Sequence, residues 1–115
     1  MARLTYLELP VSDLASAKAF YAAAFDWDFT DFGPSYAATT SGDTDIGLDA
    51  DPAEKSAAAL PVIEVDDLEA CEAKVRAAGG VITVPIFAFP GGRRFHFRDS
   101  AGHELSAMVV DPDQP

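Results

Sequence analysis

The sequence predicts an α+β domain made of two tandem βαβββ modules, each with one helix and one sheet. The first observation is that the order strand, helix, three strands occurs twice in 115 residues. The second is that "YLELPVSDL" at residues 6–14 aligns with "LPVIEVDDL" at residues 60–68, with V-x-D-L where each strand passes into a helix. A repeat this complete indicates a repeated fold unit. We expect module one at about residues 1–50, a linker at 51–58 and module two at about 59–111.

Module one begins with alternating residues at 3–11, which predict a strand. Ser12 or Asp13 could cap the helix that follows, because either side chain can accept a hydrogen bond from an unpaired backbone N–H. Helical spacing predicts an apolar stripe of Leu14, Ala17, Tyr21 and Ala24, widened by Phe20 and Phe25. Three short strands are then expected at residues 27–32, 36–40 and 44–50, with a turn at 41–43.

Module two repeats this order. A strand at residues 60–65 leads into a helix at 66–78, for which Asp66 and Glu69 form a predicted capping box. Gly79 and Gly80 can end this helix in a left-handed turn. Strands are expected at residues 81–87, 93–99 and 104–110, with a turn at 89–92 and a frayed tail at 111–115.

Composition limits the classes of function. The formal net charge is −11, and phosphate backbones repel such a surface, so we expect no nucleic-acid partner. There is no apolar run long enough to span a bilayer, no signal-peptide pattern at the start, and Cys71 is the single cysteine, which together favour the cytoplasm and no membrane partner. Residues 41–72 contain ten acids and one base, which indicates either a solubilising surface or attraction for a cationic ligand.

Three segments, "LELPVSDLASAKAFYAAAFDW", "EVDDLEACEAKVRAAGG" and "FRDSAGHEL", resemble the vicinal oxygen chelate superfamily. This superfamily includes glyoxalase I, extradiol dioxygenases and bleomycin-resistance proteins. The resemblance covers nearly the whole chain. It implies paired βαβββ modules whose mixed sheet curls into an open cup, and a homodimer.

The resemblance also implies where a divalent ion would be bound in the metal-dependent members. Their His, Glu or Gln ligands correspond here to Tyr6, Leu48, Leu60 and Ser106. The two leucines offer no lone pair, Ser106 is a weak neutral ligand, and Tyr6 could not hold an ion alone. We therefore expect no metal cofactor. His96 and His103 are seven residues apart across a strand and a turn, so they are not expected to converge on an ion.

Alternation along the strands predicts which side chains face the cup. Phe95 and Phe97 should pack under the helix, while Arg94 and His96 face away from it. An anionic or carbonyl-bearing ligand could bind to Arg94 and His96 if their face is the cup. Asp99, Gly102 and His103 are typical of a structural turn. The predicted ligand-binding residues are Tyr6, Glu8, Trp27, Tyr36, Leu60, Arg94, His96, Ser106 and Met108.

Three functions remain open from the sequence. The first is a metal-free protein that binds a small organic molecule in the cup. The second is a glyoxalase- or isomerase-like enzyme that uses a metal, or uses Glu8, Tyr6 or His96 as acid or base without one. The third is a component of a larger assembly. For Glu8 the alternative role is an ordinary carboxylate in water or paired with an arginine, and for each aromatic it is core packing.

Overall fold

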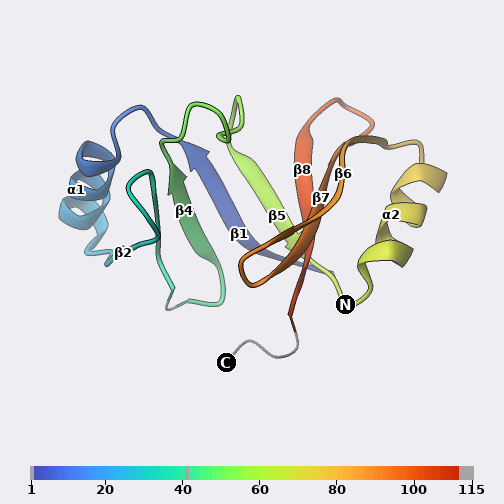
Figure 1. The fold of residues 1–115 in the computed structure, drawn as a ribbon, viewed down its shortest axis with the longest axis horizontal. Coiled ribbons are helices and arrows are strands. Elements are labelled where there is room, and N and C mark those ends of the chain that lie inside the picture. Colours follow the sequence, from blue (N-terminus) through green and yellow to red (C-terminus); the bar gives the residue numbers. More distant parts are fainter. Residues whose placement is uncertain (1, 41, 112–115) are drawn as a thin grey trace. The chain divides into compact units, whose positions relative to one another are not determined.

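A computed structural model describes residues 2–40 and 42–111. The chain divides into two compact units, residues 5–60 and residues 61–115 with 1–4. Each unit contains the helix and most strands of one predicted module (Figure 1). Ser41, at the start of the predicted turn at 41–43, and residues 112–115 of the predicted tail lie outside the described residues.

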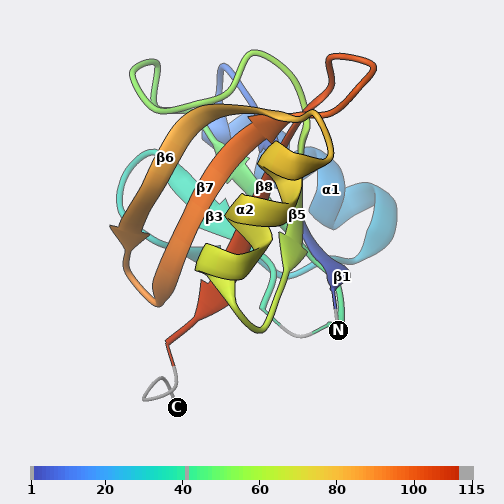
Figure 2. The ribbon, with the colours of Figure 1, turned by 90° about the vertical axis from the view of Figure 1, so that its right-hand side faces the viewer.

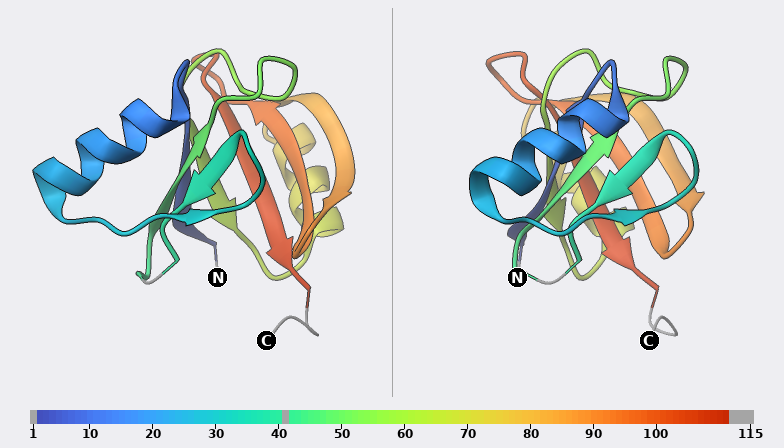
Figure 3. Two further views of the ribbon diagram at one scale, coloured as in Figure 1. Left: turned by 60° about the vertical axis from the view of Figure 1, so that its left-hand side comes forward. Right: turned by 90° about the vertical axis from the view of Figure 1, so that its left-hand side faces the viewer.

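Module one contains five elements. They are β1 (Arg3–Pro10), α1 (Leu14–Phe25), β2 (Thr30–Asp31), β3 (Tyr36–Ala38) and β4 (Asp45–Asp49). Its strands are hydrogen-bonded in the order β2-β3-β4-β1. Strand β4 runs parallel to β1 and antiparallel to β3, because α1 and the two short strands return the chain to the starting edge. Figure 3 shows α1 to one side of this sheet.

Helix α1 starts directly after Asp13, one of the two residues predicted to cap it. Asp13 is the cap, with its carboxylate accepting a hydrogen bond of 3.1 Å from the backbone N–H of Ser16. The expected widening of the apolar stripe is wrong, because Phe20 and Phe25 are 61% and 56% exposed. The strand predicted at residues 27–32 is also shorter than expected, since only β2 pairs with β3.

Module two has the same order of elements. They are β5 (Leu60–Glu64), α2 (Leu68–Ala77), β6 (Val81–Phe89), β7 (Gly92–Arg98) and β8 (Glu104–Val110). Its strands follow the order β5-β8-β7-β6, with β8 parallel to β5 and antiparallel to β7. Helix α2 contacts β6, β7 and β8, and Figure 2 shows it in front of them.

The cap of α2 differs from the predicted capping box. Asp67, rather than Asp66, is the N-cap, because its backbone is extended and its carboxylate accepts a hydrogen bond of 3.0 Å from the N–H of Ala70. Gly79 does adopt a left-handed conformation after the helix, with φ of 94°, as predicted.

The core of module two lies beneath α2. Leu68 of the helix packs with Phe95 of β7 and Ala107 of β8, all of them buried, and Phe97 packs against this group. The predicted side for the two phenylalanines is therefore confirmed. Since side chains alternate along a strand, Arg94, His96 and Ser106 lie on the face that α2 does not cover.

No helix within residues 2–40 and 42–111 is both long enough and apolar enough to cross a membrane.

Candidate functional site

A hydrogen-bonded group of three polar side chains lies on the sheet of module one. We call Tyr6, Glu8 and Tyr36 the tyrosine–glutamate cluster. The hydroxyl of Tyr36 donates to Oε2 of Glu8 at 2.8 Å, and the hydroxyl oxygens of Tyr6 and Tyr36 are 2.5 Å apart. A phenol has one proton to donate, and that of Tyr36 goes to Glu8. The oxygen of Tyr36 therefore accepts the proton of Tyr6, and the three groups form a directed chain.

The surroundings of this cluster keep Tyr36 protonated. Burial is the main cause that raises the pKa of Tyr36, and the neighbouring charge of Glu8 and the hydroxyl of Tyr6 raise it further. Glu8 is only 5% exposed, so its carboxylate is buried. A buried carboxylate requires hydrogen-bond donors, and Tyr36 supplies one.

Gly47 makes room for the cluster. In the strand register it lies between Glu8 on β1 and Ala38 on β3. A Cβ atom at this position would overlap the hydroxyl oxygens of both Tyr6 and Tyr36. Gly47 is not among the residues predicted from the sequence, although a glycine inside a strand is a recognised sign that other groups approach the backbone closely.

A second polar group lies on module two, on the face opposite α2. We call Ser106 and His96 the serine–histidine cluster; these residues are directly opposite each other on β8 and β7. Ser106 is completely buried, and the side chain of His96 is 14% exposed. Neither Oγ of Ser106 nor Nε2 of His96 has a hydrogen-bond partner among the described residues, and both atoms are buried.

Charged neighbours surround the serine–histidine cluster. Nδ1 of His96 lies 3.8 Å from Oε2 of Glu104, too far for a hydrogen bond, and Thr83 donates to that same oxygen at 2.9 Å. The pKa of His96 is lowered, first by burial and then by the positive charge of Arg94, while Glu104 opposes the shift. The imidazole is therefore neutral at pH 7 and carries a single N–H.

Arg94 lies on the same face as His96, two residues earlier on β7. Its guanidinium carbon is 5.3 Å from the ring centre of Phe87 and 5.4 Å from that of Phe89. These cation–π contacts hold the head group beside the strand pair. Met108 of β8 is opposite Arg94, so a flexible apolar side chain borders it.

The family assignment follows from a comparison with protein-family models. Residues 3–106 match the model described as "Glyoxalase/Bleomycin resistance protein/Dioxygenase superfamily". The chain belongs to this superfamily. A search of curated proteins found no match.

Several solved structures have a similar fold over almost the whole chain. Hypothetical protein BH1468 from Bacillus halodurans C-125 has a TM-score of 0.81 and 13% identity, covering 99% of this chain and 98% of that one. Methylmalonyl-CoA epimerase from Mycobacterium tuberculosis has a TM-score of 0.77 and 15% identity, covering 95% and 88%. The Mn(II)-bound glyoxalase from Novosphingobium aromaticivorans has a TM-score of 0.69 and 20% identity, covering 100% of this chain and 44% of that one. At these identities the likeness shows the fold, and it confirms the predicted fold class.

The strand register corrects one of the four positions assigned to the superfamily's metal ligands. The repeat aligns each residue of module one with the residue 54 positions later, so Glu8 corresponds to Val62. Glu8 pairs with Gly47 on the parallel strand of module one, and Val62 pairs with Ser106 on that of module two. Gly47 is therefore the counterpart of Ser106. Leu48 pairs with Leu9 on the opposite face, so its assignment is wrong by one residue.

The corrected set does not suit a divalent ion. Glycine and leucine side chains have no lone pair, the serine hydroxyl is a weak neutral ligand, and the hydroxyl of Tyr6 is hydrogen-bonded to Tyr36. The four positions are Tyr6, Gly47, Leu60 and Ser106. Within the described ranges there is also no group of three or more His, Cys, Asp or Glu side chains that could hold an ion.

Trp27 does not join the tyrosine–glutamate cluster. It stacks on Tyr21 at 5.5 Å between ring centres and lines a cavity of about 470 Å³ together with Leu7 and Ile46. Leu7 alternates with Tyr6 and Glu8 along β1, so this cavity lies on the opposite face of the sheet. Of the two aromatic residues Trp27 and Tyr36, both predicted to bind a ligand, Tyr36 is part of the cluster and Trp27 is not.

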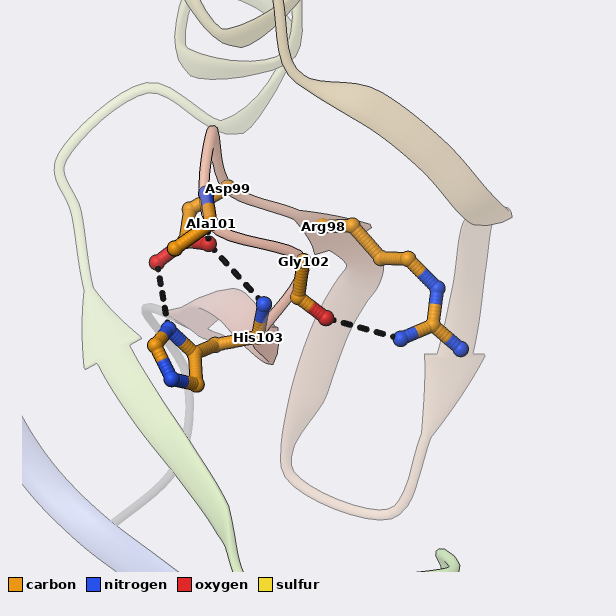
Figure 4. Close-up of polar contacts among 5 residues, drawn as sticks. All are labelled: Arg98, Asp99, Ala101, Gly102 and His103. Carbon is orange, nitrogen blue, oxygen red and sulfur yellow. Dashed lines mark hydrogen bonds and ion pairs between the residues drawn. The ribbon is translucent and has the colours of Figure 1, made fainter.

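The turn between β7 and β8 is built around Asp99, as Figure 4 shows. Oδ1 of Asp99 accepts from the backbone N–H groups of Ala101 and His103, both at 2.9 Å. Nδ1 of His103 is 3.2 Å from Oδ2 of Asp99, while its side chain is 75% exposed. Gly102 has φ of 90°. These contacts agree with the structural role predicted for this turn.

Replacing Gly47 with alanine tests the packing of the tyrosine–glutamate cluster. The added methyl group overlaps the two phenol oxygens, so we expect the free energy of unfolding to fall by about 1–3 kcal/mol in urea denaturation. The matched background is Tyr6→Phe with Tyr36→Phe, in which both oxygens are removed and the alanine should cost less. An equal cost in the two backgrounds would contradict the described packing.

Proposed function

We propose that this superfamily member binds a small organic molecule and holds no resident divalent metal. The observation that carries the proposal is the chemistry at the four metal-ligand positions, where Tyr6, Gly47, Leu60 and Ser106 offer no adequate set of donors. Polar groups are nevertheless retained on the sheet faces. A few polar groups among apolar side chains are typical of small-molecule sites. A cytoplasmic location is part of the proposal, supported by the single cysteine.

Native mass spectrometry of protein purified from its own host tests both halves of this proposal. We expect a bound small molecule, and less than stoichiometric Ni, Zn, Mn or Fe in elemental analysis of the same sample. Adding a chelator should leave the melting temperature unchanged, because in this proposal the folded protein binds no metal ion.

A thermal-shift screen with cationic glycopeptides and common metabolites provides the independent check. A ligand present at 100 times its Kd stabilises the protein by about 2.7 kcal/mol, which is a shift of several degrees. Stoichiometric metal would overturn the metal-free half of the proposal. Failure of every molecule to bind in both experiments would overturn the binding half.

We also propose a homodimer, supported by the exposed apolar surface of α1. No residue of this helix is buried, and Phe20 and Phe25 are both largely exposed. The only charged residue of α1 is Lys18, and it pairs with Asp31 at 2.7 Å. A second copy could therefore pack on the apolar surface of α1 without burying an unpaired charge of the helix itself, although exposed acids such as Asp13 and Asp26 flank it.

Light scattering after size exclusion tests the dimer. We expect twice the mass of the chain for the natural sequence and a shift toward monomer for Phe20→Glu. Val81→Glu is the matched control, because Val81 is an equally exposed apolar residue on module two. A natural protein that remains monomeric at high concentration, or equal dissociation by both variants, would count against α1 as the interface.

A second candidate function is metal-free proton transfer, and the directed chain from Tyr6 through Tyr36 to Glu8 favours it. The oxygen of Tyr6 would take a proton from a carbon next to a carbonyl group. The proton of Tyr6 would pass to Tyr36, and the proton of Tyr36 to Oε2 of Glu8, leaving an enolate and a neutral carboxylic acid. Returning the proton along the same chain would complete an exchange or an isomerisation.

Proton exchange of pyruvate in D₂O, followed by ¹H NMR, tests this candidate. We expect the protein to accelerate loss of the methyl signal and Glu8→Gln or Tyr36→Phe to slow it at least about a hundredfold, the lower end of what a general base contributes. His103→Gln is the control, because His103 belongs to the exposed turn. No acceleration, or equal rates for Glu8→Gln and the natural protein, would exclude this role.

A further inference from the structure

The serine–histidine cluster contains two buried polar atoms that have no hydrogen-bond partner within residues 2–40 and 42–111. These are Oγ of Ser106 and Nε2 of His96, on adjacent strands at the same level of the ladder. Leaving a buried donor or acceptor unsatisfied destabilises a fold, and most such groups in folded proteins have partners. Two such atoms on paired residues of adjacent strands indicate a binding position for a ligand group that is not part of the chain.

The chemistry of the neighbours identifies the kind of group. Ser106 can donate its hydroxyl proton, and His96 can donate from Nε2 because Glu104 lies too far from Nδ1 to fix the other tautomer by a hydrogen bond. Arg94 brings a permanent positive charge to the same face, oriented by Phe87 and Phe89. Two neutral donors beside a guanidinium suit an oxygen anion.

The sheet face that carries Ser106 and His96 does not share the strongly negative net charge of the whole chain. Alternation and register place two arginines, Arg94 and Arg98, and two glutamates, Glu64 and Glu104, on this face. Of the glutamates, Glu104 already accepts the hydroxyl of Thr83. Among the described residues of this face the positive and negative side chains are equal in number, so they do not oppose an anion at Ser106 and His96.

Resting on the small-molecule binding proposed above, we infer that Ser106, His96 and Arg94 bind the carboxylate of a small organic acid. One carboxylate oxygen accepts from Ser106 and His96, and Arg94 compensates the charge. Met108 and Arg94 have flexible side chains, so they can move aside to admit the ligand.

The two histidines of the chain provide the experiment, because His96 reports on the site and the exposed His103 is an internal reference. Pyruvate is titrated into the protein at fixed pH while the imidazole C–H signals are followed by NMR, with His103→Gln used for assignment. We expect a saturable shift of the His96 signal and no comparable shift of His103. A His96 signal that does not saturate, or equal movement of both signals, would overturn the inference.

Ser106→Ala separates a ligand-binding role from a structural one. Because Oγ has no partner within the described part of the chain, its removal should leave the melting temperature unchanged or higher, yet weaken pyruvate binding about tenfold. Arg94→Gln retains the His96 reporter and should weaken binding as well, so the inference stays testable if one variant folds poorly. Unchanged affinity in both variants would overturn it.

A panel of neutral and cationic molecules distinguishes failure of this inference from failure of the broader proposal. Stabilisation by such molecules, with no response to pyruvate, would overturn the carboxylate assignment and leave small-molecule binding in place. No response to any molecule, and none bound in native mass spectrometry, would overturn both.

Discussion

The parallel pairing of the first and last strand of each module is the constraint from which the rest of the structure follows. A parallel partner requires a long crossover, and in module two α2 occupies that crossover and lies against β6, β7 and β8. One helix can cover only one face of its sheet. Apolar side chains such as Phe95 therefore gather beneath the helix, and the alternate positions remain available for polar chemistry.

The equivalence of Gly47 and Ser106 shows how two copies of one architecture have diverged. In module one the position has no side chain, and the phenol groups of Tyr6 and Tyr36 occupy the space above it. In module two the position keeps a small hydroxyl, which lies beside His96. Neither solution provides a normal metal ligand. The first produces a satisfied hydrogen-bond chain, and the second leaves buried polar atoms without partners in the part of the chain that the structure describes.

Period-two alternation and the internal repeat were sufficient to predict the fold class and the faces of β7, because both depend on local geometry. The sequence could not distinguish Asp66 from Asp67 as the cap, since the choice depends on which backbone is extended. Leu48 was assigned in place of Gly47 because a shift of one residue reverses the face of a strand, and only the paired register fixes it. The sequence could not show that Trp27 stacks on Tyr21, because this contact depends on tertiary packing.

The contrast between the two clusters has an energetic consequence. In the tyrosine–glutamate cluster, the buried carboxylate of Glu8 receives a hydrogen bond from Tyr36, which offsets part of the cost of burying it. In the serine–histidine cluster no such hydrogen bond is made among the described residues, and burying polar atoms without one costs stability. Selection for stability alone would favour an apolar residue at position 106, because the described residues supply no hydrogen bond to the serine hydroxyl.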